Sequence, residues 1–410
     1  MKTTTHKKWL RNIASSFAIV SSLLVSVLYS TQAQAIPSFA RQTGAACTKC
    51  HSVSFPRLNA TGERFMRNGF KLKTTGESLD GLGDDEGDKD VIKAKNLMLL
   101  KDVGDILSVR GKFDLFNKNE SSAKSSTGSP DFFAVFAAAQ LAPDVALWAE
   151  AETNTSNGET EVHNYMVNFT NLGSGNNKSL VNVRFGGFTP TEWTSWSDQK
   201  RVIDSASSHP GIYRGKHHFA KVGSGLGTKT GAEFYGYTDN FLFAAGFGEA
   251  TGGNFHASKP DSNKDFWLVG RYDITNGSSL SVLYMDYGNG ITSYTISGNY
   301  KLNKDIEFQA QYSKDDSGSV TGRSDVSGYG FQGIYTFNDE WLGILRYDST
   351  DNGYAVNEQE NQLSTGIVYA PWMNVKFTLA YVAELDRATT SLTGSTVTDD
   401  SVTLQMQFAM

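Results

Sequence analysis

The chain has 410 residues, a formal net charge of −6 at neutral pH, 40 glycines and 8 prolines, and 12% of its residues are aromatic. The acidic balance disfavours a nucleic-acid partner and suits cationic ones. Beyond the first residues, no run approaches the roughly 18 uninterrupted apolar residues of a spanning helix, so a helical membrane protein is excluded. The composition favours β-structure with many turns.

Residues 1–35 are predicted to be a secretory signal peptide. Four basic residues precede an apolar run, and the stretch contains no acidic residue. Ala33 and Ala35 then form a small-residue cleavage site. The alternative is an uncleaved membrane anchor. Cleavage after Ala35 would remove the four positive charges, take the formal net charge from −6 to −10, and indicate export of the Gram-negative type.

A short motif follows in residues 36–73. Cys47 and Cys50 are the only two cysteines of the chain, and His51 comes directly after them. Cys-x-x-Cys-His is the attachment sequence of a c-type haem, in which the thiols bond to the vinyl groups and the imidazole is the proximal iron ligand. A disulfide would leave His51 without a role, and zinc would need two further strong ligands. We therefore predict a monohaem cytochrome c domain with one covalent haem c.

The stretch LNATGERFMRNGFKL, just after the motif, predicts a short helix with Asn59 or Thr61 as N-cap and Gly69 at its end. Gly62 and Phe65 share one helical face, and we expect both to pack on the haem. A domain of about forty residues usually needs a covalent or metal cross-link to be stable, and the haem would supply it. We expect the domain to lie in or against the periplasmic mouth of a barrel.

The distal haem ligand is open. Met66 is the nearest sulfur, and thioether ligation is known in cytochromes c. The alternatives are His217 and His218, in the long loop 189–230, which is long enough to fold into the lumen.

Residues 74–95 form an acidic, glycine-rich linker between this domain and the rest of the chain. The linker either steers a basic periplasmic cytochrome to the haem or serves as a solvated spacer. Its acids are Asp80, Asp84, Asp85, Glu86, Asp88 and Asp90.

Residues 96–410 contain about sixteen segments of roughly ten residues in which polar and apolar residues alternate, as in DIEFQAQYS at 305–313. Short links alternate with long polar ones along the chain, which is typical of outer-membrane barrels with short periplasmic turns and long extracellular loops. A soluble sandwich or propeller is the alternative. We predict an all-β transmembrane barrel of about 16 antiparallel strands, with both termini on the periplasmic side.

With motif and barrel combined, the chain resembles the fused monohaem cytochrome-porins of the outer membrane, known from iron-oxidising bacteria. The residues that carry the resemblance are Pro37, Phe39-Ala40-Arg41-Gln42-Thr43-Gly44, Cys47, Cys50, His51, Pro56, Leu58, Gly62, Phe65, Gly69 and Phe70. One position departs from the pattern, because Glu63 stands where a basic residue is expected. The resemblance implies that the haem accepts electrons from extracellular Fe(II) and passes them to a periplasmic c-type cytochrome or another electron carrier.

Two other functions share this architecture. One is a diffusion porin with a haem-stapled plug, and the other is the same conduit carrying electrons outward to an extracellular acceptor. If the chain oxidises Fe(II), carboxylates of the outer loops are candidate entry points for the ion, which prefers carboxylate, imidazole and water ligands. These are Asp261, Asp315, Asp316, Glu358, Glu360, Asp399 and Asp400.

Overall fold

The structure is a computed structural model. It describes residues 37–53, 55–71, 106–119, 129–142, 144–155, 158–173, 179–197, 200, 202, 228–250, 264–275, 277–288, 292–316, 326–351, 359–372, 374–385 and 400–410. The predicted signal peptide, the acidic linker, His217 and His218 lie outside these residues.

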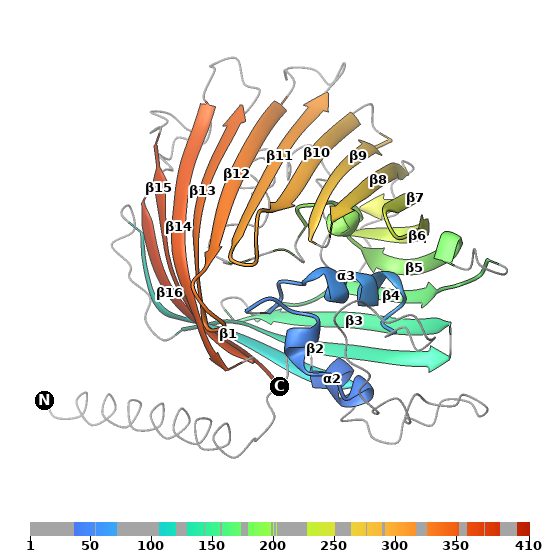
Figure 1. The fold of residues 1–410 in the computed structure, drawn as a ribbon, viewed down its shortest axis with the longest axis horizontal. Helices are drawn as coiled ribbons and strands as arrows, with labels where there is room; N and C mark the ends of the chain where they lie inside the picture. Colours follow the sequence, from blue (N-terminus) through green and yellow to red (C-terminus); the bar gives the residue numbers. More distant parts are fainter. Residues whose placement is uncertain are drawn as a thin grey trace, which may run out of the picture.

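Sixteen antiparallel strands form one closed barrel, in which each strand pairs with its neighbours in sequence and β1 also pairs with β16 (Figure 1). The strands are β1 (Leu107–Asn119), β2 (Ser129–Ala142), β3 (Val145–Asn154), β4 (Thr160–Phe169), β5 (Asn182–Phe188), β6 (Lys229–Tyr237), β7 (Phe241–Ala250), β8 (Asp265–Thr275), β9 (Ser278–Asp286), β10 (Thr292–Lys301), β11 (Ile306–Asp316), β12 (Val326–Thr336), β13 (Trp341–Asp351), β14 (Gln359–Trp372), β15 (Val375–Glu384) and β16 (Ser401–Ala409). The predicted barrel of about sixteen strands is confirmed.

The outer surface of the barrel is apolar and its enclosed surface is polar. Along β10, Tyr294 and Ile296 are 42% and 46% exposed, whereas Thr295 and Ser297 between and beyond them are buried. Successive residues of a strand point to opposite faces, so the two-residue period places every second side chain in the lumen. This is the reverse of a soluble sandwich, and it matches the apolar-out, polar-in pattern of membrane barrels.

Asparagine side chains shape two of the short turns. Asn303 Oδ1 accepts hydrogen bonds from the backbone N–H groups of Asp305 and Ile306 between β10 and β11, both at 2.8 Å. Asn338 Oδ1 accepts two equivalent bonds, each of 2.9 Å, between β12 and β13. An asparagine that bonds to its own backbone two residues on closes a tight turn locally, which explains why these links are short.

Four short helices are described: α2 (Pro37–Thr43), η1 (Cys47–Lys49), α3 (Ala60–Arg67) and η5 (Pro190–Trp193). Asn59 is the N-cap of α3, since its Oδ1 accepts from the N–H of Gly62 at 3.0 Å. Gly69, just past the helix, has a φ of 64°, the left-handed conformation that ends helices. No helix among the described residues is long and apolar enough to cross a membrane.

The segment carrying α2, η1 and α3 contacts the wall at points spread around the barrel (Figure 1). The Gln42 amide donates to the carbonyl of Ala138 on β2 at 2.6 Å. Arg67 pairs with Asp273 on β8 at 2.6 Å. Arg57 also pairs with Glu307 on β11. Because β2, β8 and β11 lie on different sides of a closed barrel, the segment lies within the lumen.

Candidate functional site

The Cys-x-x-Cys-His motif forms one tight turn. Cys47 to Lys49 make up η1, and the N–H groups of Cys50 and His51 both donate to the carbonyl of Cys47, at 3.1 and 2.9 Å. The two cysteines form no disulfide. The turn therefore holds two thiols and an imidazole on three closely spaced positions, as covalent haem attachment requires.

Asn59 and Gly62 attach this turn to α3. The Asn59 amide donates to the carbonyls of Lys49 and Thr48 at 3.0 and 3.2 Å, while its oxygen caps the helix. A Cβ atom on Gly62 would collide with the carbonyl oxygen of Cys50 and lie 2.8 Å from Leu58 Cδ2. Gly62 lines a cavity beside the motif. However, the close approach that requires a glycine is to the backbone of the motif itself.

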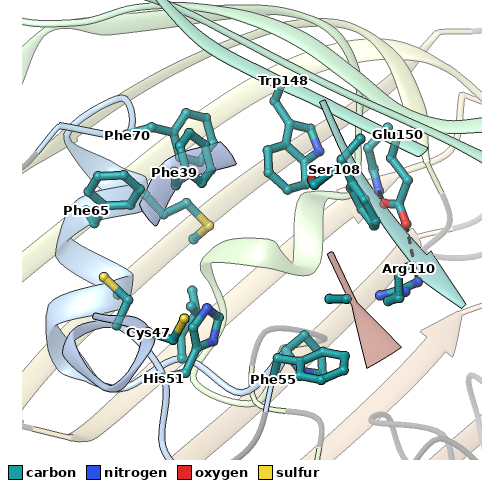
Figure 2. Close-up of a pocket in the computed structure, with 18 of the residues that line it drawn as sticks. Phe39, Cys47, His51, Phe55, Phe65, Phe70, Ser108, Arg110, Trp148 and Glu150 are labelled. Carbon is teal, nitrogen blue, oxygen red and sulfur yellow. Dashed lines mark hydrogen bonds and ion pairs between the residues drawn. The ribbon is translucent and has the colours of Figure 1, made fainter. Parts of the chain in front are cut away.

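A cavity of about 500 Å³ lies between the motif and the barrel wall (Figure 2). Cys47 and His51 line one side of it, and Trp148 and Arg110 lie across from them on β3 and β1. Cys50 also lines the cavity. Its wall thus combines the N-terminal segment with strands far from that segment in sequence.

Aromatic rings form one end of the cavity. Phe39, Phe70 and Trp148 stack in near-parallel planes, with centroids 4.9 Å apart for the two phenylalanines and 5.8 and 5.6 Å from each to Trp148. Phe65 packs edge-on against Phe39 at 5.1 Å. These rings give a planar, apolar ligand flat surfaces to pack on.

Buried charges form another part of the wall. Arg184 on β5 donates to Glu233 on β6 through Nε at 2.7 Å and to Glu192 in η5 through Nη1 at 2.5 Å. The indole N–H groups of Trp193 and Trp267 also donate to Glu233, at 2.6 and 2.7 Å. Arg184 and Glu233 are 2% and 0% exposed, so this network is fixed in the interior.

Three further ion pairs continue the polar wall along β1 to β3. Arg110 Nη2 lies 3.4 Å from Glu150 Oε1 and 3.7 Å from Glu152 Oε2, and Figure 2 shows the contact with Glu150. Lys112 pairs with Asp131 at 2.5 Å. On this side of the cavity, basic groups of β1 are therefore paired with acidic groups of β2 and β3.

Several polar atoms around the cavity are buried and have no hydrogen-bond partner within the part of the chain that the structure describes. Buried polar groups are nearly always paired with protein or with ordered water, so these atoms can bond to water or to a polar ligand in the cavity. The atoms are Ser108 Oγ, Arg110 Nε, Asn164 Oδ1, Asn168 Oδ1 and Arg184 Nη2.

The protonation of the motif suits a haem. Burial lowers the pKa of His51 to about 4, so the imidazole is neutral and can ligate iron at neutral pH. Burial and the neighbouring Cys47 raise the pKa of Cys50 to about 11, unlike the lowered values of reactive catalytic thiols. The donors, the flat aromatic surfaces and the cavity together fit covalent haem c.

An ion-pair network docks α3 onto the barrel. Glu63 accepts from both terminal nitrogens of Arg271 on β8, at 3.2 and 2.8 Å, and also from Lys200 at 3.1 Å. Arg271 continues the network to Asp273 at 2.8 Å, and Asp273 holds Arg67. Glu63 is the position at which the sequence departs from the cytochrome-porins that it resembles, and here its charge joins the N-terminal segment to the wall.

The structure brings together most of the residues predicted from sequence. Gly62, Phe65 and Met66 all line the cavity with the motif, whereas His217 and His218 lie outside the described residues. No group of three or more His, Cys, Asp or Glu side chains among the described residues is placed to hold a metal ion by itself.

Sequence reasoning missed the barrel's own contribution to the site. Trp148, Met166 and Arg184 line the cavity from β3, β4 and β5. Met166 is 6% exposed, and its sulfur lies 3.7 Å from Arg184 Nη1. It is a second thioether on the cavity wall, in addition to Met66. A large or charged residue at an inward position of a strand is the signal that could have identified them.

No protein-family model matches the chain, and no curated protein matches it. Solved structures of porins do. OmpF of Salmonella typhi, in complex with daunomycin, has a TM-score of 0.56 at 12% identity, covering 74% of this chain and 97% of OmpF. The chain has a porin-like fold. An anion-selective porin from Comamonas acidovorans gives a TM-score of 0.52 at 14% identity, covering 74% of this chain and 99% of the porin.

Proposed function

We propose that this chain is an electron-transfer protein of the bacterial outer membrane. Haem c in its porin-like barrel accepts electrons from extracellular Fe(II) and passes them to a periplasmic carrier such as a c-type cytochrome. The observation that carries the proposal is a Cys-x-x-Cys-His turn facing a cavity inside a closed barrel with an apolar outer surface. The Fe(II) donor rests on the family resemblance.

An apolar band of about 25 Å separates the two sides of an outer membrane and blocks hydrated Fe²⁺ and charged carriers. A bound haem would supply a one-electron centre within that barrier. In this chain, Cys47 and Cys50 would hold the haem, the neutral imidazole of His51 would ligate its iron, and the aromatic rings at one end of the cavity would exclude water.

The test is direct. Purified oxidised protein is mixed with Fe(II) near neutral pH, and the Soret and α bands are followed. We expect reduction of the haem, and a double variant Cys47→Ser/Cys50→Ser should be colourless and lack the added porphyrin mass. If the wild-type haem stays oxidised with Fe(II) but is reduced by dithionite, the assignment of the donor fails.

The direction of electron flow is tested by potentiometry. A midpoint potential well below that of the Fe(III)/Fe(II) couple under the same conditions would favour outward flow to an extracellular acceptor. A potential at or above that couple supports Fe(II) as the donor.

The fold itself favours a second function, a diffusion porin with a haem-stapled plug, because the solved structures most similar in fold include porins. Planar-bilayer recordings distinguish the two functions. A porin should give a large conductance that does not depend on the redox state of the haem.

A further inference from the structure

One nitrogen of the buried charge network has no partner. Arg184 uses Nε for Glu233 and Nη1 for Glu192, but its Nη2 is buried and unpaired among the described residues. Arg184 is only 2% exposed and lines the cavity. A guanidinium has five N–H donors in a rigid plane, so the remaining ones have a fixed direction.

Packing holds that plane in place. The Arg184 guanidinium carbon lies 4.0 Å from the centroid of Phe188 and 4.7 Å from that of Trp193. With two carboxylates and two rings around it, the side chain cannot turn Nη2 toward another protein partner without breaking these contacts. An unpaired donor of this kind is costly to bury, so it favours a cavity occupant that accepts a hydrogen bond from it.

A second unpaired group lies beside it. Asn168 on β4 pairs directly with Arg184 on β5 in the strand register and is 3% exposed. Its Oδ1 is buried and has no partner in the described part of the chain. Asn168 also lines the cavity. An amide can present either its oxygen or its NH₂ group to a ligand, so the pair offers a cationic fork and an adaptable dipole.

We propose that Arg184 and Asn168 form a carboxylate-binding site for a propionate of the haem that Cys47 and Cys50 hold. This inference rests on the proposed function, since it takes a haem as the occupant of the cavity. Arginine forks are the preferred partners of carboxylates in proteins. The barrel wall would thus hold the haem at its propionate side while the N-terminal segment holds it by thioethers.

The charges of the groups already bonded to Arg184 still allow it to pair with another carboxylate. Glu233 is compensated by Arg184 together with the indole N–H groups of Trp193 and Trp267. Burial raises the pKa of Glu192 above its ordinary value, which favours a protonated, neutral carboxyl on the other side of Arg184. Tyr235 packs 5.0 Å from Trp193 and adds no charge.

Two variants test the site without emptying the network. Arg184→Lys keeps a positive charge for the two glutamates but removes the fork. Asn168→Asp is nearly isosteric and places a carboxylate opposite Nη2, where it competes with the propionate. The matched control is Arg346→Lys, since Arg346 is 1% exposed, pairs with Asp348 and does not line the cavity.

The readouts are covalent haem content, the midpoint potential over a range of pH, and redox-difference infrared spectra of protein carrying haem with ¹³C-labelled propionates. We expect full haem content in all three variants. Arg184→Lys and Asn168→Asp should shift the labelled carboxylate band, and Asn168→Asp should also lower the midpoint potential and move its pH-dependent region upward. Arg346→Lys should match the wild type.

The outcomes separate the inference from the function on which it rests. If the wild type carries haem and neither Arg184→Lys nor Asn168→Asp moves the labelled band, the propionate site is refuted while the proposed function stands. A lowered potential in Asn168→Asp without a band shift also refutes it, because the new charge then acts at a distance. A wild type without covalent haem overturns the proposed function itself.

Discussion

Gly62 shows how one missing side chain can set the distance between two elements. The helix α3 approaches the carbonyl of Cys50 so closely that any Cβ atom at position 62 would overlap it. The glycine is therefore needed to place His51 and both thiols under the helix, whether or not the haem touches it.

We predict that Gly62→Ala forces α3 away from the motif and costs about 1–3 kcal/mol, the usual cost of overpacking. The measurement is thermal unfolding followed at the Soret band, with covalent haem content as a second readout. Gly298→Ala is the control, because a Cβ there would meet atoms at 3.8 Å, which is ordinary contact. Equal stability of both variants would contradict the prediction.

Glu63 acts through charge rather than shape. Burial alone would raise the pKa of its carboxyl, but Arg271, Lys200 and Arg67 outweigh burial and hold the pKa well below the ordinary value of 4.5. A carboxyl with a lowered pKa in the folded state stabilises the fold fully above its unfolded value, and that contribution is lost as the pH falls further.

We therefore predict that α3 undocks in acid. Stability should decline as the pH drops below about 4.5, and Glu63→Gln should remove that part of the decline because it has nothing to protonate. Glu63→Ala should cost about 3–5 kcal/mol at neutral pH, since it leaves Arg271 and Lys200 buried with fewer partners. Unfolding in detergent at stepped pH measures both effects.

The control for these variants is Asp144→Asn. Asp144 pairs with Lys71 at 2.7 Å but its side chain is 51% exposed. Exposed pairs contribute at most about 1 kcal/mol, so this change should alter neither the neutral-pH stability nor the acid profile measurably.

At the scale of elements, an aromatic stack joins three parts of the chain. Phe39 belongs to α2, Phe70 follows α3, and Trp148 stands on β3 in the wall. The stack fastens both helices to one strand, and with the Glu63 network on β8 it holds the segment from two sides of the lumen.

We predict that Trp148→Ala loosens the segment without opening the barrel, at a cost below the about 3–5 kcal/mol of a fully buried aromatic truncation, because this indole is only partly buried. Limited proteolysis should cleave within residues 37–71 faster than in the wild type, while the barrel remains intact. Trp372→Ala is the comparison, because that indole is 45% exposed on the outer surface. Faster cleavage in both variants would argue against a specific role of the stack.

The elements that depend on a local sequence pattern were predictable from the sequence. The contacts between elements distant in sequence were not. Alternation in stretches such as 305–313 is visible in sequence, because a strand's two faces meet different surroundings. Asn59 was recognisable as a cap for the same local reason. Arg184 and Trp148 reach the site only because the barrel closes, and no local pattern relates either of them to Cys47.

At the scale of the whole molecule, the N-terminal segment occupies the lumen of a porin-like barrel. We predict that the intact protein shows a small conductance in planar bilayers, and that Glu63→Ala increases the frequency of large openings by weakening one anchor. Gly298→Ala should behave as the wild type. A large, steady conductance of the unmodified protein would instead support the diffusion porin.

The contact between Cys47 and the last strand has a consequence for biogenesis. Cys47 is 7% exposed and packs with Phe55 and Ala409, next to the point where β16 meets β1. Enzymes that ligate porphyrin to thiols need the cysteines in reach, and the folded protein covers Cys47 almost completely. Under our proposal the haem is therefore attached to an unfolded periplasmic precursor. Insertion of the final hairpin, β15 and β16, then encloses it.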